Sequence, residues 1–222
     1  MQSSRVGDYT IWYENTEEFY ELKKEIFVEH RYYIELDNIA PRIVDLGAHI
    51  GMSVLYWKKL YPEASIVACE PVTENFDLLE KNVLENGLTG IELHKKAVAP
   101  KAGEIELQIP NTSGWMSGAG IISRGWRGVQ DTSPRRVEAV TIAELLRSGA
   151  DLVKMDIEGM EYEVVESVDW SRVGTVMIEV HPRAGKRIET IEKKLKLAGF
   201  ATERREDKSR YGSGLIMLYG RR

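Results

Sequence analysis

A glycine-containing segment that begins at residue 45 has the sequence of a ligand-binding loop. Asp45-Leu-Gly-Ala-His-Ile-Gly51 directly follows a β-branched run and opens an amphipathic segment, which is the strand-to-helix context of a nucleotide-binding loop. Gly47 permits a tight turn and a close approach to a ligand, while Gly51 permits close helix packing. Dinucleotide loops need Gly-x-Gly-x-x-Gly to hold phosphates, and Ala48-His49 replaces the middle glycine here. A ligand without a pyrophosphate therefore fits this segment better.

An acidic residue ends the next predicted strand. Glu70 precedes Pro71, and its carboxylate should face the same crevice as the glycine segment, because neighbouring parallel strands end at one edge of a sheet. A carboxylate in that position can accept hydrogen bonds from ribose hydroxyls. About 20 residues separate the glycine segment from Glu70, as in a mononucleotide-binding unit. His49 is expected to contact backbone in the loop rather than to act as a base.

Three carboxylates lie close together after a later predicted strand. Asp156 and Glu158 end this strand, and Glu161 begins the next helix. Such groups repel one another unless a cation is near or one pKa is raised, which is typical of functional sites. Asp156, at the carboxyl end of the strand, is the better functional candidate. Glu161 has an alternative structural role, because a negative charge is favourable at a helix N-terminus.

Glu179 and His181 alternate along the following strand, so both side chains should reach the same crevice. An imidazole can take a proton from a hydroxyl near neutral pH, which makes His181 a candidate general base, with Asp156 or Glu158 beside it. Two alternatives stay open: His181 is only hydrogen-bonded beside the strand end, or Asp156, Glu179 and His181 bind a metal ion. The sequence identifies no partner that would orient such ligands, and we predict no metal.

An alternation of strands and helices must position these residues. Short β-branched or apolar runs predict strands at residues 42–46, 65–70, 91–93, 152–156 and 173–180. Residues 51–61 and 73–85 carry apolar side chains at helical spacing, and Asn86-Gly87 can end the second helix. Thr141 and Glu144 match a capping box, which predicts a short helix that ends near residue 149. This alternation predicts a parallel sheet covered on both faces.

The two ends of the chain depart from this alternation. Residues 1–40 contain the charged amphipathic segment 17–33 and form a predicted N-terminal helical cap ahead of a domain of residues 41–222. Residues 187–197 are helical by period. Residues 200–205 and 215–219 predict an antiparallel hairpin joined by the polar turn 207–214.

Residues 110–134 form a glycine- and serine-rich stretch that has no helical or strand period and is longer than an ordinary loop. The aromatic and cationic side chains in and beside it are Trp115, Trp126, Arg124, Arg127, Arg135 and Arg136. We expect a functional loop that closes over a sugar or phosphate-bearing acceptor. The alternative is that the tryptophans only anchor the loop to the domain.

The composition is that of one globular domain, since 43% of the 222 residues are hydrophobic and 29% are charged. The net charge of -5 gives no general attraction to nucleic acid. Cys69 is the single cysteine, so an intramolecular disulfide and a cysteine-based zinc site are excluded, and a buried inert thiol is expected. Neither a signal peptide nor a membrane-spanning run is evident, and we expect a cytoplasmic protein.

Three segments resemble the FkbM family of class I S-adenosylmethionine-dependent methyltransferases: IVDLGAHIG, VACEP followed by NFDLLEKN, and VKMDIEGMEYEVV. The motif order and spacing agree over residues 43–179, and DIEGMEYEVV is the most specific element. The resemblance implies an α/β, Rossmann-like class I methyltransferase fold. Such a fold has a mostly parallel seven-stranded sheet with a C-terminal antiparallel hairpin, here with the N-terminal helical cap. Residues 1–40 and 110–134 match no motif.

The resemblance also implies roles for particular residues. Asp45, Gly47 and Gly51 would surround the methionine part of the cofactor, Glu70 would bind the ribose hydroxyls, and Ala97-Val98 would border the adenine. The full set predicted to bind S-adenosylmethionine is Asp45, Gly47, Ala48, His49, Gly51, Glu70, Pro71, Ala97, Val98 and Asp156. The set predicted to act in catalysis is His181, Asp156 and Glu158.

The reaction implied by the resemblance is O-methylation. The family is mostly associated with hydroxyls of sugars, polyketides and other natural products, so we expect a small-molecule or glycan acceptor and neither a nucleic-acid nor a membrane partner. A nucleotide-dependent oxidoreductase is the first alternative, which the missing phosphate glycine disfavours. A catalytically inactive methyltransferase-like binding protein is the second, and the presence of Gly47, Gly51 and Glu70 argues against it.

Overall fold

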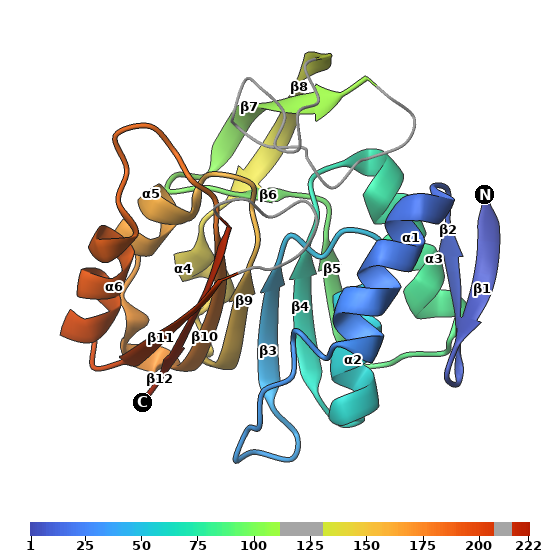
Figure 1. The fold of residues 1–222 in the computed structure, drawn as a ribbon, viewed down its shortest axis with the longest axis horizontal. Helices are drawn as coiled ribbons and strands as arrows, with labels where there is room; N and C mark the ends of the chain where they lie inside the picture. Colours follow the sequence, from blue (N-terminus) through green and yellow to red (C-terminus); the bar gives the residue numbers. More distant parts are fainter. Residues whose placement is uncertain (112–130, 207–214) are drawn as a thin grey trace.

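A seven-stranded sheet forms the centre of the computed structural model, which describes residues 1–111, 131–206 and 215–222 (Figure 1). The strand order is β11-β12-β10-β9-β3-β4-β5. Five strands are parallel: β3 (Arg42–Leu46), β4 (Ser65–Cys69), β5 (Ile91–His94), β9 (Ala150–Met155) and β10 (Val173–Val180). These are the five predicted strands, with ends that differ from the prediction by at most two residues. Because β4 and β9 lie on opposite sides of β3, the strand order reverses at β3, and ligands of α/β proteins bind at such a point.

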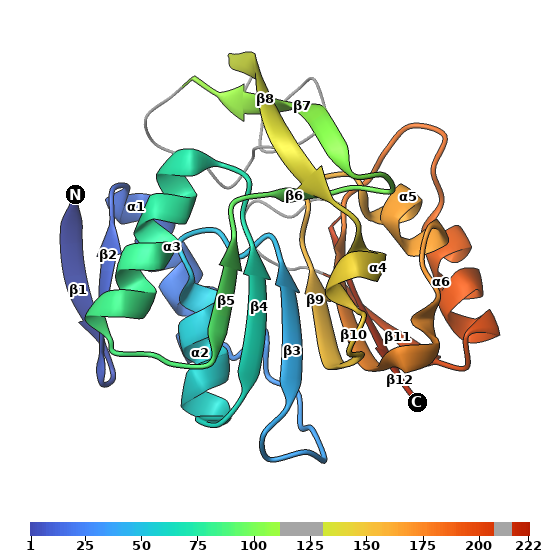
Figure 2. The same ribbon diagram turned by 180° about the vertical axis from the view of Figure 1, so that it is seen from behind.

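Alternate side chains of the central strands enter two separate cores. Ile43 and Ile66 pack on one face of the sheet, whereas Val44 and Val67 pack on the other. The first core includes residues of α1 (Thr16–Lys23), the π-helix η1 (Lys24–Val28), α2 (Met52–Leu60) and α3 (Thr73–Glu85). The second includes residues of α4 (Ile142–Leu145), α5 (Glu161–Glu166), the 3-10 turn η4 (Trp170–Arg172) and α6 (Ile188–Leu197). Figure 1 is seen from the side of α2, and Figure 2 from the side of α4.

Local sequence signals set the ends of several helices. Thr141 and Glu144 form the predicted capping box, because each side chain accepts a hydrogen bond from the backbone N–H of the other. Gly87 has a φ of 60° just after α3, which is the left-handed conformation expected of a residue that ends a helix. The predicted helix ends are confirmed at these two points, whereas the helix that follows Thr141 ends at Leu145 and not near residue 149 as predicted.

The C-terminal hairpin extends the sheet. β11 (Ala201–Glu206) and β12 (Ile216–Arg221) are antiparallel to each other, and β12 is also antiparallel to β10. This confirms the predicted antiparallel hairpin. The predicted turn at residues 207–214 lies outside the described residues.

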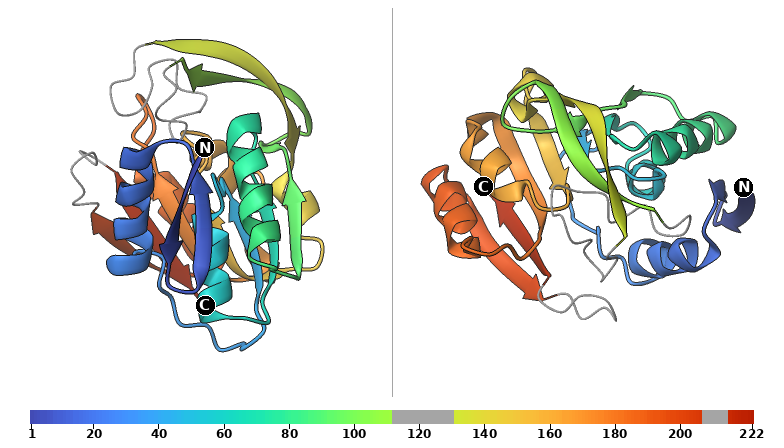
Figure 3. Two further views of the ribbon diagram at one scale, coloured as in Figure 1. Left: turned by 90° about the vertical axis from the view of Figure 1, so that its right-hand side faces the viewer. Right: turned by 90° about the horizontal axis from the view of Figure 1, so that it is seen from above.

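The N-terminal segment begins with a hairpin that was not predicted. β1 (Gln2–Val6) and β2 (Tyr9–Tyr13) pair ahead of α1, so the cap is not purely helical. Asn82 of α3 and Asn86, which directly follows this helix, bind the free edge of β2. Asn82 accepts a hydrogen bond from the N–H of Trp12 (2.6 Å) and donates one to its carbonyl (3.0 Å), and Asn86 does the same at Thr10, at 2.8 Å each way. Figure 3 shows this hairpin beside α3.

A second small sheet lies beyond the carboxyl ends of the central strands (Figure 1). Its order is β6-β8-β7, formed by β6 (Ala97–Val98), β7 (Gly103–Pro110) and β8 (Thr132–Val140). The prediction that residues 110–134 lack strand structure was thus wrong at both ends. β8 is largely exposed and rich in charged residues, so it lacks the apolar alternation by which strands are recognised.

The middle of the predicted loop, with Trp115, Trp126, Arg124 and Arg127, lies outside the described residues. Arg135 lies in β8, where its guanidinium binds both carboxylate oxygens of Glu74 at 2.9 and 2.7 Å. In the described parts of the chain, no helix combines the length and apolar character needed to cross a membrane.

Candidate active site

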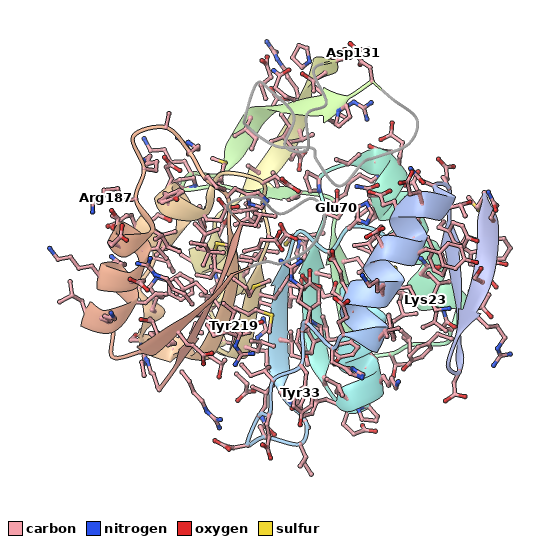
Figure 4. The ribbon with its side chains drawn as sticks, in the orientation of Figure 1. Lys23, Tyr33, Glu70, Asp131, Arg187 and Tyr219 are labelled. Atoms are coloured by element: carbon pink, nitrogen blue, oxygen red, sulfur yellow. The ribbon has the colours of Figure 1, made fainter. Side chains whose placement is uncertain are left out.

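A cavity opens at the carboxyl ends of β3, β4 and β9, and its empty space including the open mouth is about 1070 Å³. Nine of the twelve residues predicted to form the site line it: Gly47, Ala48, His49, Glu70, Pro71, Ala97, Val98, Asp156 and Glu158. Asp45, Gly51 and His181 are absent from its wall. Figure 4 shows Glu70 at the upper end of the central strands.

The two loop glycines are required by packing within the protein. Gly47 has a φ of 84°, and a Cβ atom there would lie 1.8 Å from the carbonyl oxygen of Asp156. Gly51 has a φ of 88°, and its Cβ would lie 2.6 Å from a methyl group of Leu79 on α3. The loop can therefore lie close to the segment after β9 and to α3 only if both positions are glycine.

Glu70 is a buried carboxylate held by donors of the protein. Its Oε2 accepts the N–H of His49 at 2.9 Å, and its Oε1 accepts the N–H of Val72 at 2.9 Å and the side-chain amide of Asn75 at 3.4 Å. Burial raises the pKa of Glu70 above its ordinary value, although these donors oppose the rise. Each carboxylate oxygen has two lone pairs, so further donors can still be accepted.

His49 contributes its backbone to this arrangement, while its ring contacts α1. The residue has a φ of 51°, and its Nε2 lies 3.5 Å from a carboxylate oxygen of Glu18. The expected contact of the imidazole with loop backbone is not found, because α1 packs beside the loop and presents Glu18 to the ring.

Lys154 is a buried cation that sequence reasoning missed. Its Nζ lies 3.2 Å from Asp45 Oδ1 and 3.9 Å from Asp156 Oδ2, and it donates a hydrogen bond to the carbonyl of Gly47 at 2.6 Å. Burial lowers the pKa of Lys154, but Asp45, Tyr32 and Asp156 outweigh this effect and raise the pKa above its ordinary value. A charged residue inside the apolar run Leu-Val-Lys-Met was the signal that could have revealed it.

The three carboxylates after β9 surround His181, which is itself 1% exposed. His181 Nδ1 lies 2.9 Å from Glu161 Oε1, and Nε2 lies 3.1 Å from Glu158 Oε2 and 4.0 Å from Asp156 Oδ1. Burial lowers the pKa of His181, but Glu158 and Glu161 outweigh it and raise the pKa well above the ordinary value. The imidazole therefore lies behind the cavity wall as the partner of carboxylates.

Glu179 and the N-terminal cap form another part of the wall. Arg31 lies 3.1 Å from Glu179 and 3.2 Å from Glu25, and all three side chains are largely buried. Burial raises the pKa of Glu179 to about 8, with a further contribution from Asp156, while Arg31 opposes the rise. Sequence reasoning missed Arg31 and Glu25 because residues 1–40 match no motif.

The alternative metal site can be assessed from the same atoms. One ligand atom each of Asp156, Glu179 and His181 lies within 4.8 Å of the others. A histidine binds a metal through a nitrogen without a proton, whereas both ring nitrogens of His181 face carboxylates. Metal binding at this set would require His181 to lose a proton and Glu158 to move away from Nε2.

Comparison with known proteins identifies the family. A family model described as the methyltransferase FkbM domain matches residues 45–202. The chain belongs to the FkbM methyltransferase family. Methyltransferase sdnD of Sordaria araneosa is 31% identical over 212 residues, with 80% of each chain covered. The 31-O-demethyl-FK506 methyltransferase FkbM of Streptomyces tacrolimicus is 26% identical over 204 residues, with 78% of each chain covered.

Solved structures agree with this FkbM-family assignment at the level of fold. The methyltransferase FkbM of Methylobacillus flagellatus KT superposes with a TM-score of 0.58 at 15% identity, over 92% of this chain and 54% of that longer chain. TYW2 of M. jannaschii, solved in complex with AdoMet, gives a TM-score of 0.51 at 14% identity, over 99% and 84% of the two chains. The predicted class I methyltransferase fold is confirmed, and the oxidoreductase alternative is set aside.

This FkbM-family protein is an S-adenosylmethionine-dependent methyltransferase, and the described residues fit such a cofactor. Asp156 Oδ1 is buried in the wall and accepts no hydrogen bond from any described residue. A buried acceptor of this kind suits the ammonium group of a methionine moiety. Glu70, with acceptor capacity left, suits ribose hydroxyls.

Proposed function

We propose that this methyltransferase acts on a hydroxyl oxygen of a small molecule or sugar, and that Glu158 takes up the acceptor proton. The observation that carries the proposal is the position of Glu158 between the cavity and His181. Glu158 lines the cavity together with Asp156, and its carboxylate lies 3.1 Å from the buried imidazole of His181. S-adenosylmethionine, when bound, supplies an electrophilic methyl group.

The cofactor would be held by two carboxylates and by the backbone around them. Glu70 would bind the ribose hydroxyls and Asp156 the methionine ammonium group, since Glu70 is a buried carboxylate with acceptor capacity and Asp156 has a buried Oδ1 without a donor among the described residues. Asp45 would act indirectly, because it lies behind the wall and is bonded to Lys154 and to the hydroxyl of Ser53. The remaining residues proposed to contact or support the cofactor are Gly47, Ala48, His49, Gly51, Pro71, Ala97 and Val98.

The acceptor oxygen must lose its proton as its bond to the methyl carbon forms, so a base must face it. Burial raises the pKa of Glu158, although His181 opposes the rise. A carboxylate with a raised pKa holds an incoming proton more strongly near neutral pH, which suits a general base. His181 lies outside the wall, so we assign direct proton uptake to Glu158 rather than to the imidazole.

The acceptor class is supported by the chemistry of the remaining wall and by the relatives. Arg31 offers donors, and Glu25 and Glu179 offer acceptors, beside the carboxylates after β9. Such a mixed polar surface suits a molecule with several hydroxyls. The FkbM relative of Streptomyces tacrolimicus is named for a 31-O-demethyl acceptor, which favours oxygen as the methylated atom. On this proposal residues 1–40 form an acceptor-facing cap on a methyltransferase domain of residues 41–222.

The test is to incubate the protein with isotope-labelled S-adenosylmethionine and an extract of small hydroxylated molecules, and to identify products by mass spectrometry and NMR. We expect the label on a hydroxyl oxygen. With that acceptor, Glu158→Gln should lower turnover by about 100-fold or more at unchanged cofactor affinity. Glu163→Gln is a matched control on α5, because Glu163 pairs with Arg183 and Lys186 instead. Label on nitrogen, or full turnover of the Glu158 variant, would contradict the proposal.

A further inference from the structure

Three side chains form a chain of ion pairs that ends at the cavity. Glu161 Oε1 lies 2.9 Å from His181 Nδ1, and His181 Nε2 lies 3.1 Å from Glu158 Oε2. Glu161 is 0% exposed and His181 is 1% exposed. Of the three, Glu158 is the one that lines the cavity. The order is carboxylate, imidazole, carboxylate, and the last member faces the proposed acceptor.

This geometry favours a charged imidazole. An ionised carboxylate only accepts hydrogen bonds, so a ring nitrogen that faces one at hydrogen-bond distance must carry a proton. Both nitrogens of His181 lie within 3.1 Å of a carboxylate oxygen, and this double contact stabilises the charged imidazolium form. The raised pKa of His181 agrees with this reading, since burial alone would lower that pKa and the two carboxylates outweigh it.

A backbone hydrogen bond also holds Glu161 in place. Its Oε1 also accepts the backbone N–H of Gly159 at 2.9 Å, and it is the first residue of α5. The predicted structural role, a favourable charge at the start of a helix, is compatible with this position. The same oxygen also contacts His181 Nδ1 at 2.9 Å, so Glu161 can also influence the cavity through the imidazole.

Other titratable groups face the imidazole from the neighbouring elements. Asp156, after β9, lies 4.0 Å from Nε2. Glu179 on β10 and Tyr162 on α5 also interact with it electrostatically. The carboxylates among these groups favour the positive charge of His181. Among the ion-pair distances between His181 and the described carboxylates, the one to Glu161 is the shortest.

We propose that Glu161 is a positioning residue for methyl transfer: it holds His181 as an imidazolium, whose Nε2–H keeps Glu158 ionised and oriented towards the acceptor. This inference rests on the proposed function of Glu158. Without the carboxylate of Glu161, the imidazole loses its proton at a lower pH. Its Nε2 lone pair then faces Glu158, and two acceptors repel each other.

The experiment compares the wild-type protein with Glu161→Gln and with the control Glu163→Gln. The titration of His181 is followed by NMR of the imidazole ring, and the signal is assigned among the four histidines with a His181→Gln variant. We expect wild-type His181 to stay protonated well above pH 7. In Glu161→Gln its titration should move down by about one to two pH units, the shift that corresponds to a lost charge-assisted hydrogen bond.

The same shift should appear in the reaction. With the acceptor identified as above, kcat/KM of Glu161→Gln should fall on the alkaline side at a pH lower by about one to two units than in the wild type. The dissociation constant of S-adenosylmethionine should be unchanged in Glu161→Gln. Glu163→Gln should show neither shift.

Two results would overturn the inference. One is a wild-type His181 that titrates at or below the ordinary histidine value of about 6.5, which can be measured even if Glu161→Gln does not fold. The other is a folded Glu161→Gln protein that loses stability but keeps the wild-type titration and pH profile, which would make Glu161 purely structural. A failure of the proposed function is recognised separately, because Glu158→Gln would then keep full turnover.

Discussion

Replacing Lys154 with methionine should destabilise the protein strongly, because the lysine is the buried partner of buried acids. Its Nζ lies 3.2 Å from Asp45 Oδ1, and the two side chains are 4% and 0% exposed. Methionine keeps most of the length of the side chain but removes the charge. The change leaves Asp45 without its counter-charge and the carbonyl of Gly47 without its donor at 2.6 Å.

The size of the effect follows from the burial of the pair. Removing one partner of a buried ion pair costs about 3–5 kcal/mol, since the other charge stays in a medium of low dielectric constant. Asp45 keeps the hydrogen bond from the hydroxyl of Ser53 at 2.5 Å, which favours the lower part of this range. For a chain of this size, the loss corresponds to a decrease in Tm of roughly 6–20 °C.

The assay is equilibrium unfolding in urea, followed by tryptophan fluorescence, with the m-value checked for constancy. Lys95→Met is the matched control, because Lys95 pairs with Asp77 while 43% exposed and should cost at most about 1 kcal/mol. The double variant Lys154→Met with Asp45→Asn should regain part of the loss, because the uncompensated charge is gone. A loss below about 1 kcal/mol for Lys154→Met would refute the assignment of Lys154 as the required counter-charge.

Three further predictions concern the cofactor, the N-terminal hairpin and pH. Glu70→Gln should weaken S-adenosylmethionine binding roughly 10- to 150-fold in calorimetry, because this is the scale of a lost charge-assisted hydrogen bond. An unchanged affinity would remove Glu70 from the cofactor site. Asn82→Ala should lower the free energy of unfolding by about 1–3 kcal/mol and speed amide exchange in β2, because the backbone groups of Trp12 lose their partner. Equal amide protection in the variant and the wild type would contradict this. Because the pKa of Glu179 is raised to about 8, the folded protein keeps this proton up to about pH 8, whereas the unfolded chain loses it near the ordinary value of 4.5. The free energy of unfolding should therefore fall between those two pH values. Urea titrations should show a flatter pH dependence of this free energy for Glu179→Gln than for the wild type. Parallel pH curves for the two proteins would exclude Glu179 as the cause.

Local patterns made the sheet and most of the cavity wall predictable. Strands such as β3 and β10 are short apolar runs, and the residues after them meet at one edge of a parallel sheet whatever the acceptor. Gly47, Glu70 and Asp156 could therefore be placed at one cavity from the sequence. The same reasoning could not tell which side of the wall a residue occupies, and His181 lies behind it.

Features that depend on contacts between distant segments were missed. Arg31 reaches the wall only because the cap packs beside β10, 148 residues away in the sequence. Lys154 pairs with Asp45 on the neighbouring strand β3, and this contact across the sheet leaves no local pattern in the sequence. β1 and β2 are short, and the binding of β2 to Asn82 of α3 leaves no periodic signal in the sequence.

The attachment of the N-terminal hairpin has a consequence for the order of events during synthesis. The backbone of Trp12 binds Asn82, 70 residues later in the chain, and an isolated two-stranded hairpin is marginally stable in water. At about 5–20 residues per second, the ribosome needs roughly 4–14 s to make that intervening length. The hairpin must therefore wait, and it docks only after α3 has emerged and formed. Because Asn82 also donates to the carbonyl of Ile50 at 2.8 Å, this late docking connects the N-terminal hairpin to the glycine loop.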